Sequence, residues 1–278
     1  MLSGPFLSKD WIGAVGDYDS AKVVMLGVGF DGTCTHIPGS RFAPERLRLA
    51  SWGLEDYSPV FDKHLDEVMF YDAGDLELPF GNTEKALNII KNNVSRIYHS
   101  GKKYFGVGGE HLVTLPAIEA CYQTHKDIAV LHFDAHTDLR EDYLGDKKSH
   151  ASVMRRVGEI IGFENLKQVG IRSGTKEEFD LTKKYDTLLD SPVQLESLRN
   201  KKVFVSLDVD VLSPGVLPGT GTQEAGGLSY NELTEWIKKL KELDIIGIDV
   251  VELAPDVDKS GTSTAITAKI IRELLMVL

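Results

Sequence analysis

Short apolar runs alternate along the chain with longer segments whose apolar residues recur at helical spacing, and this alternation limits the possible folds more than any other feature. It predicts an α/β fold, with a parallel sheet covered by helices on both faces. We expect strands at residues 22–30, 67–71, 103–107, 128–133, 167–171, 202–207 and 244–251. We expect helices at residues 44–51, 83–99, 115–122, 150–161, 175–184, 229–243 and 264–278. Because no repeat, low-complexity tract or linker divides the chain, we expect a single domain over residues 1–278.

Polar residues follow several of these expected strands directly. They are residues 108–111 (Gly-Gly-Glu-His), residues 134–138 (Asp-Ala-His-Thr-Asp), residues 208–210 (Asp-Val-Asp) and Glu252. In open α/β sheets, ligands bind in the crevice outside the carboxyl ends of the strands. We therefore expect these polar groups to meet at one edge of the sheet.

The strand at 128–133 is followed by an Asp-x-His-x-Asp row. On an extended backbone alternate side chains point the same way, so we expect Asp134, His136 and Asp138 to share one face at the strand end. Residues 208–210 repeat this spacing of carboxylates on a second strand. Because burying carboxylates without a partner is very costly, the pattern indicates bound cations.

Adding the histidine of residues 108–111 completes a set of candidate metal ligands. They are His111, Asp134, His136, Asp138, Asp208 and Asp210. The four aspartates carry a charge of −4, which two divalent ions would neutralise. Oxygen and nitrogen donors without a thiolate favour Mn²⁺, with Fe²⁺, Co²⁺ or Mg²⁺ as alternatives, over a structural zinc ion. Each motif alone is also typical of a turn or a helix cap, but their combination at strand ends indicates a metal site.

Composition restricts the partners and the compartment. The net charge of −11 argues against nucleic acid or an anionic membrane, because phosphate binding requires clustered Lys and Arg, and it is compatible with a cationic ligand. Cys34 and Cys121 form no disulfide framework or metal-type spacing, and residues 1–6 lack the features of a signal peptide. No apolar run approaches the ~20 residues that span a bilayer. We therefore expect a cytoplasmic protein.

Taken together, these residues resemble the signature blocks of the ureohydrolases, a family that contains arginase, agmatinase and formiminoglutamase. The resemblance rests on residues 108–111, 134–138, 206–210 and Glu252, and it covers most of the chain. Residues 29–42 and 219–222 are most similar to the agmatinase branch. The resemblance implies a three-layer α/β/α sandwich with an eight-stranded parallel sheet, and two Mn²⁺ ions per subunit.

The resemblance also implies a role for each residue. The implied metal ligands are His111 and Asp138 on one ion, His136 and Asp210 on the other, and Asp134 and Asp208 as bridges between them. His150 matches the family's proton-shuttling histidine, and Glu252 matches the carboxylate that binds the substrate guanidinium. Asp138 would also stabilise the tetrahedral centre that forms when the guanidinium carbon is attacked.

The implied reaction is hydrolysis of agmatine to urea and putrescine, a step of polyamine biosynthesis. Other ureohydrolase substrates (guanidinobutyrate, guanidinopropionate, arginine or formiminoglutamate) stay open, as does a non-catalytic metal-binding homologue. The related metal-dependent deacetylases are disfavoured because the chain has no His-His pair. The resemblance also implies a homo-oligomer, either a trimer or a hexamer.

Two departures from the family pattern leave the substrate open. The family usually has Asp-Pro where this chain has Ser213-Pro214, and Gly-Thr-Pro where it has Gly221-Thr222-Gln223. Both lie in the loop that we expect to border the pocket. Arg140 lies close to the metal-ligand row in sequence, where it could bind a substrate carboxylate or form a surface salt bridge.

Overall fold

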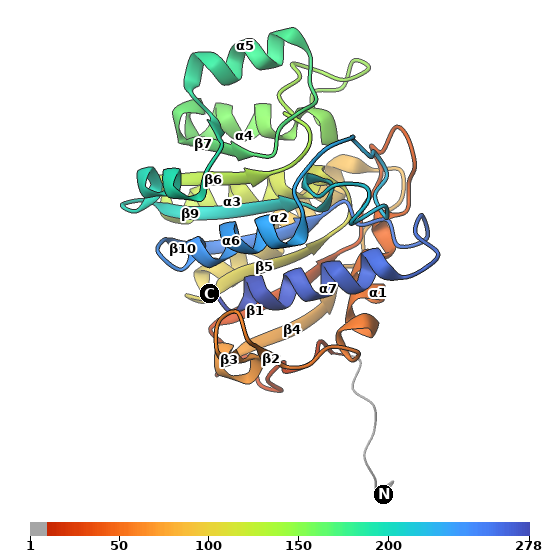
Figure 1. The fold of residues 1–278 in the computed structure, drawn as a ribbon, viewed down its shortest axis with the longest axis vertical. Helices are drawn as coiled ribbons and strands as arrows, with labels where there is room; N and C mark the ends of the chain where they lie inside the picture. Colours follow the sequence, from red (N-terminus) through yellow and green to blue (C-terminus); the bar gives the residue numbers. More distant parts are fainter. Residues whose placement is uncertain (1–9) are drawn as a thin grey trace, which may run out of the picture.

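The computed structural model describes residues 10–278. An eight-stranded sheet runs through the molecule, and all of its neighbouring strands pair in parallel (Figure 1). In spatial order the strands are β4 (Phe70–Asp75), β1 (Val23–Val28), β5 (Lys103–Gly108), β10 (Asp244–Val251), β9 (Lys202–Asp208), β6 (Ile128–Phe133), β7 (Leu166–Val169) and β8 (Leu188–Leu189).

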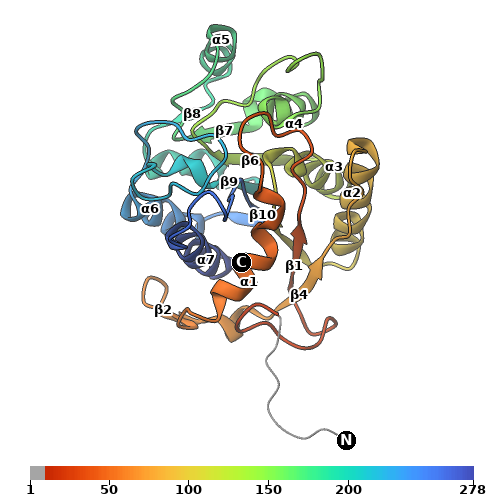
Figure 2. The same ribbon diagram turned by 90° about the vertical axis from the view of Figure 1, so that its right-hand side faces the viewer.

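Helices cover both faces of this sheet (Figure 2). One layer contains α2 (Thr83–His99), α3 (Thr114–His125) and α4 (Val153–Ile161), and the other contains α1 (Ala43–Ser51), α6 (Tyr230–Leu240) and α7 (Thr262–Leu275). Helix α5 (Lys176–Tyr185) connects β7 to β8. The expected three-layer sandwich with an eight-stranded parallel sheet is therefore confirmed.

The strands are buried on both faces, which explains their continuous apolar sequences. In β1, Val23 and Met25 pack into the core beneath α1, α6 and α7, whereas Val24 and Leu26 pack into the core beneath α2, α3 and α4. The same alternation runs through β6 and β9. These three strands thus contribute side chains to two separate cores.

Shorter elements connect these layers. A two-stranded hairpin is formed by β2 (Tyr57–Ser58) and β3 (Lys63–His64). The 3-10 helices are η1 (Ser40–Phe42), η2 (Leu65–Val68), η3 (His111–Val113), η4 (His150–Ser152), η5 (Phe163–Asn165), η6 (Pro192–Leu198) and η7 (Val209–Val211). Three of them (η3, η4 and η7) contain residues that we expected in the site.

Most of the expected elements are present, with shifted ends. The strands expected at 128–133 and 244–251 have those bounds. The strand expected at 67–71 begins at Phe70, because η2 precedes it and Met69 has a left-handed backbone with φ 58°. The residues alone did not predict β8, since two residues carry no periodic pattern.

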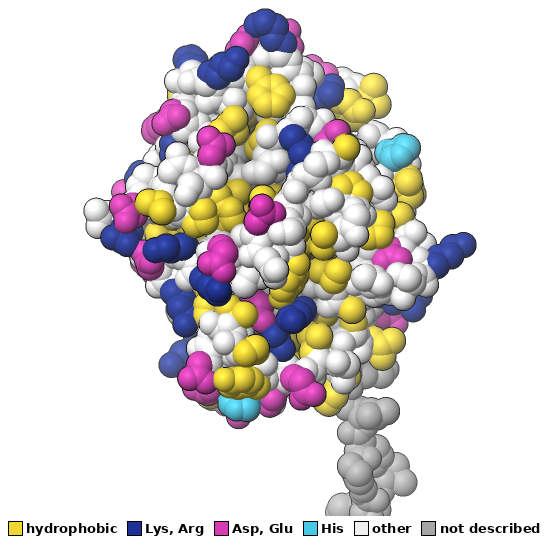
Figure 3. Space-filling view, in the orientation of Figure 1, with side chains coloured by type: hydrophobic (Ala, Val, Ile, Leu, Met, Phe, Trp, Pro, Cys, Tyr) yellow, Lys and Arg dark blue, Asp and Glu magenta, His cyan; other side chains and the backbone are white. Residues whose placement is uncertain are grey.

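The surface and the termini bear on the other expectations. Within residues 10–278, no helix is long and apolar enough to cross a membrane. On the face drawn in Figure 3, acidic and basic side chains are interspersed, so this face carries no broad basic surface for a phosphate backbone. The expectation that residues 1–6 form no signal peptide lies outside the described residues.

Candidate metal centre

The Asp-x-His-x-Asp row does not continue β6, and our strand-based explanation of it is wrong. β6 ends at Phe133, and residues 134–138 form a bent segment beyond it. The Asp134 carboxylate accepts a hydrogen bond from the backbone N–H of His136 at 2.5 Å. Asp138 has a left-handed backbone with φ 52°. The loop, rather than alternation along a strand, turns these side chains toward one another.

The second carboxylate pair also leaves its strand. Asp208 is the last residue of β9, and its carboxylate accepts from the backbone N–H of Asp210 in η7 at 2.8 Å. The Asp210 carboxylate accepts from the backbone N–H of Ala135 at 2.9 Å. Because β6 and β9 are neighbours in the sheet, this bond fastens the two strand ends to each other.

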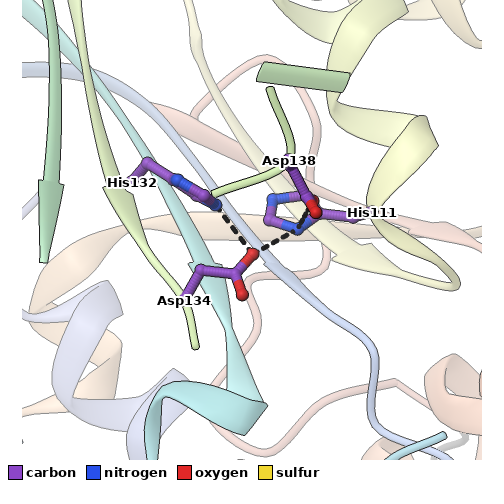
Figure 4. A group of neighbouring side chains, drawn as sticks. All are labelled: His111, His132, Asp134 and Asp138. Atoms are coloured by element: carbon purple, nitrogen blue, oxygen red, sulfur yellow. Dashed lines mark hydrogen bonds and ion pairs between the residues drawn. The ribbon is translucent and has the colours of Figure 1, made fainter. Parts of the chain in front are cut away.

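His111 reaches the same position from the end of β5, as the first residue of η3. Its Nδ1 lies 3.0 Å from Asp134 Oδ2, 3.2 Å from Asp138 Oδ2 and 3.3 Å from Asp208 Oδ2. Figure 4 shows the imidazole of His111 directed at the Asp134 carboxylate, with the Asp138 carboxylate beside the same imidazole. Three separate strand ends therefore supply one cluster, as we expected.

Two sets of side chains in this cluster could each hold a cation, because their donor atoms lie within 4.8 Å of one another. The sets are His111, His132, Asp134 and Asp138, and Asp134, His136 and Asp210. Asp134 belongs to both sets, which suits a bridging ligand. Asp208 belongs to neither set, although it lies 3.3 Å from His111 Nδ1.

Burial shifts the acidity of the clustered aspartates. Burial and then the charge of Asp134 raise the pKa of Asp138 to about 7, and the same causes raise the pKa of Asp210. Burial and the neighbouring Asp210 raise the pKa of Asp208 well above its usual range. Burial also opposes ionisation of Asp134, but contacts with His132 and His111 hold its pKa well below the usual range. A bound cation would favour the ionised form of all four.

One buried atom tests directly whether these residues fit a metal. His111 is 1% exposed, and its Nδ1 makes no hydrogen bond to the described residues although three carboxylate oxygens lie within 3.3 Å of it. Buried polar atoms are almost always hydrogen-bonded, so a nitrogen aimed without a partner at three carboxylates marks the position of a cation. Imidazole and carboxylate donors without a thiolate suit a divalent ion of the first transition row. The residues therefore fit a metal centre.

His132 is a buried histidine of this region that we did not predict. Its Nε2 lies 2.8 Å from Asp134 Oδ2, and its Nδ1 lies 3.0 Å from the side-chain nitrogen of Gln168. Figure 4 shows His132 directed at the Asp134 carboxylate. A polar residue inside the apolar strand 128–133, two positions before Asp134, was the available signal. On a strand, that spacing places both side chains on one face.

A cavity of about 360 Å³ opens over the cluster, and His150 and Glu252 both line it. Glu252 follows β10 with a left-handed backbone, φ 67°. One oxygen of its carboxylate accepts from the backbone N–H of His111 at 2.6 Å. Burial and the nearby Glu110 raise the pKa of Glu252 to about 8, so a cationic group in the cavity would favour its ionised form.

His150 begins η4, and burial lowers its pKa. The backbone N–H of His150 donates to the Thr33 hydroxyl at 3.2 Å, and that hydroxyl donates to the fully buried Glu110 at 2.7 Å. The His150 Nε2 atom lies 3.4 Å from the hydroxyl of Thr35. The loop after β1 thus positions His150. We did not predict this role for the loop from the sequence.

The rim of the cavity contains Arg140, which forms an ion pair, the salt-bridge role that we expected as one of two. The guanidinium lies 4.8 Å from the centre of the Tyr143 ring and 3.9 Å from the Glu178 carboxylate, and its side chain is 40% exposed. The departures at Ser213 and Gln223 are not among the residues that line this cavity. We expected the loop that carries them to border the pocket, and Thr220 and Thr222 of that loop do line the cavity.

Comparisons with known proteins agree with this arrangement. Residues 21–277 match the model of the arginase family. The chain is 42% identical to an agmatinase of Bacillus anthracis over 98% of this chain and 97% of the relative, and 36% identical to an N(1)-aminopropylagmatine ureohydrolase of Thermococcus kodakarensis over 90% and 88%. The crystal structure of a putative agmatinase from Clostridium difficile matches with a TM-score of 0.91 and 43% identity, covering 94% of this chain and 98% of that one. The chain therefore belongs to the arginase family.

Proposed function

We propose that this protein hydrolyses agmatine to putrescine and urea, with two Mn²⁺ ions bound at the strand ends. The observation that carries the proposal is the meeting of His111, residues 134–138 and residues 208–210 in a cavity that Glu252 also lines. The arginase family and the similarity to agmatinases over nearly the whole chain support a hydrolase that acts on amidino groups.

In this proposal each ion would be held by two residues of its own and by two residues that it shares with the other ion. The ligands are His111 and Asp138 for one ion, His136 and Asp210 for the other, and Asp134 and Asp208 for both. The contacts of His111 Nδ1 with Asp138 and of His136 Nδ1 with Asp210, at 3.2 and 2.9 Å, support the two terminal pairs. When bound, such ions supply a nucleophilic hydroxide near neutral pH by lowering the pKa of water.

The cavity residues would bind the substrate and move the proton. Glu252 would hold the guanidinium through charge-assisted hydrogen bonds, which fixes the position of its carbon. Asp138 would stabilise the tetrahedral centre that forms when the carbon is attacked. His150 would then donate a proton to the departing amine. Burial lowers the pKa of His150, which favours its neutral form, so His150 would accept the proton lost by the attacking water and pass it to the amine.

The proposal also covers the domain organisation, location and assembly of the protein. We propose a single domain over residues 1–278, supported by one continuous sheet whose strand ends build one site. We also propose a cytoplasmic location, which the free thiols of Cys34 and Cys121 support, because disulfides are rare in that compartment. A trimer or hexamer is the proposed assembly, and sedimentation analysis would measure it.

A panel of guanidino compounds tests the activity. The protein is loaded with Mn²⁺, and urea release is measured with agmatine, N(1)-aminopropylagmatine, arginine and guanidinobutyrate. We expect the highest kcat/KM for agmatine. Arg140 at the cavity rim favours a carboxylate-bearing substrate such as guanidinobutyrate as the second candidate. A higher kcat/KM for that compound would overturn the choice of agmatine, and no urea from any compound would indicate a non-catalytic homologue.

A further inference from the structure

A row of buried polar side chains crosses the sheet directly behind the metal ligands. His132 of β6 pairs in register with Ser206 of β9, and Ser206 pairs with Asp249 of β10. All three side chains are fully buried, and the other residues inside these strands, away from the strand ends, are apolar or glycine. Burying a carboxylate and an imidazole costs free energy unless both are well hydrogen-bonded, so this row needs a physical explanation.

Part of the row bonds to His111. The Ser206 hydroxyl donates to Asp249 Oδ1 at 2.7 Å, and His111 Nε2 lies 3.0 Å from the same hydroxyl. A hydroxyl has one hydrogen, and here the carboxylate takes it, so the oxygen can only accept from His111. The proton of His111 is therefore on Nε2. Its Nδ1 consequently presents a lone pair to the carboxylate cluster, where it has no other partner.

The other part of the row bonds to Asp134. The side-chain nitrogen of Gln168 donates to the backbone carbonyl of Thr137 at 2.9 Å, which fixes the orientation of the amide, because a carbonyl can only accept. The second hydrogen on that nitrogen faces His132 Nδ1 at 3.0 Å. His132 Nε2 therefore carries the proton and donates to Asp134 Oδ2 at 2.8 Å. Both ring nitrogens of His132 are thus engaged, so it supports a ligand and is not itself one.

We propose that Asp249 and Ser206 are positioning residues that hold His111 as a metal ligand, and that His132 does the same for Asp134. This inference rests on the proposed metal assignments. In those assignments His111 would hold one ion, whereas Asp134 would hold both. Replacing Asp249 or Ser206 should therefore weaken the binding of one ion, and replacing His132 should weaken the binding of both ions. Partners of this kind set the orientation and basicity of metal-bound imidazoles.

Mn²⁺ binding to the full chain, freed of metal with a chelator, measures these effects. Isothermal titration should resolve two ions on the wild-type protein. Asp249→Asn keeps the shape of the side chain. We expect this variant and Ser206→Ala to lower the affinity for one of the two Mn²⁺ ions about 10- to 100-fold and to leave the affinity for the other unchanged. We expect His132→Phe to lower the affinity for both Mn²⁺ ions by a similar factor.

A matched control separates this effect from the loss of any buried hydroxyl. The Thr267 side chain of α7 is fully buried and donates to the backbone carbonyl of Ser263 at 2.8 Å, in a helix that supplies no candidate ligand. Thr267→Val should leave both Mn²⁺ affinities at their wild-type values. Circular dichroism of each metal-free variant checks that it is folded, and Asp249→Asn provides the test if Ser206→Ala does not fold.

The outcomes distinguish the two proposals. If the wild-type chain binds no Mn²⁺, the proposed function itself fails. If the wild-type chain binds two ions and Asp249→Asn either keeps both affinities or loses both equally, the positioning inference is overturned while the proposed function stands. If His132→Phe lost affinity for only one ion, the inference that His132 positions Asp134 would be overturned.

Discussion

Replacing Glu252 by glutamine removes one charge and almost nothing else. The carboxylate lines the cavity and already accepts a hydrogen bond from the His111 backbone N–H at 2.6 Å. A glutamine carbonyl oxygen can accept that same bond, so the local backbone keeps its support. The variant therefore measures the electrostatic attraction between Glu252 and a bound guanidinium.

The size of the effect follows from burial. Breaking a buried ion pair by removing one partner costs roughly 3–5 kcal/mol, because the remaining charge is left uncompensated. The cavity is partly open to solvent, so we take the lower value of about 3 kcal/mol. Each 1.36 kcal/mol corresponds to about a tenfold change, so we expect kcat/KM for agmatine to fall about 150-fold.

Steady-state urea release with Mn²⁺-loaded protein is the assay, and metal content is measured on the same samples. We expect Glu252→Gln to bind both ions as the wild-type chain does. Glu252→Asp, which keeps the charge on a shorter side chain, should lose less activity than Glu252→Gln. A Glu252→Gln protein with kcat/KM within threefold of wild type would refute the assignment of Glu252 as the guanidinium ligand.

Further predictions concern the proton, the loop and the metal. His150→Ala should lower kcat for urea release by about 10²- to 10⁴-fold and leave the Mn²⁺ content unchanged, as metal analysis would measure. A variant with the kcat of the wild-type protein would exclude a proton-transfer role for His150. Thr33→Val removes the hydroxyl between Glu110 and His150 and should lower kcat by up to about 100-fold, whereas Thr33→Ser, which keeps a hydroxyl, should retain the wild-type kcat. If Thr33→Val caused an equal loss in a protein that already carries His150→Ala, Thr33 would not act through His150. The metal-free chain should lose stability as the pH rises through the window from the ordinary aspartate pKa of 3.8 to about 7, because the raised pKa of Asp138 lets the native state hold more protons than the unfolded state there. Mn²⁺ replaces those protons, so the increase in Tm on adding Mn²⁺ should grow from about pH 5 to about pH 8 in thermal unfolding; a constant difference would refute the shift.

Much of the architecture was predictable because its signals are local. Apolar runs and helical spacing located all the strands of the eight-stranded sheet except β8, and two strands, β6 and β10, have the expected bounds. Polar residues directly after strands indicated the edge of the sheet where the site lies. The six candidate metal ligands follow from the same reasoning, because the carboxyl ends of parallel strands meet at one edge.

The conformation beyond the strand ends was not predictable in the same way. Residues 134–138 were expected to be extended, yet they bend, and Asp138 adopts a left-handed backbone. That bend depends on hydrogen bonds to segments distant in sequence, such as the one from Ala135 to the Asp210 carboxylate. Local periodicity carries no information about such partners.

By itself, therefore, the sequence determined the order of strands and helices and the chemistry available at the strand ends. Only the tertiary structure decided which buried side chains stand behind that chemistry. His132, Ser206 and Asp249 lie far apart in the chain and become neighbours through the order and register of β6, β9 and β10. Strand order and register are set by pairing between distant segments and by packing on both faces of the sheet, which no local pattern encodes.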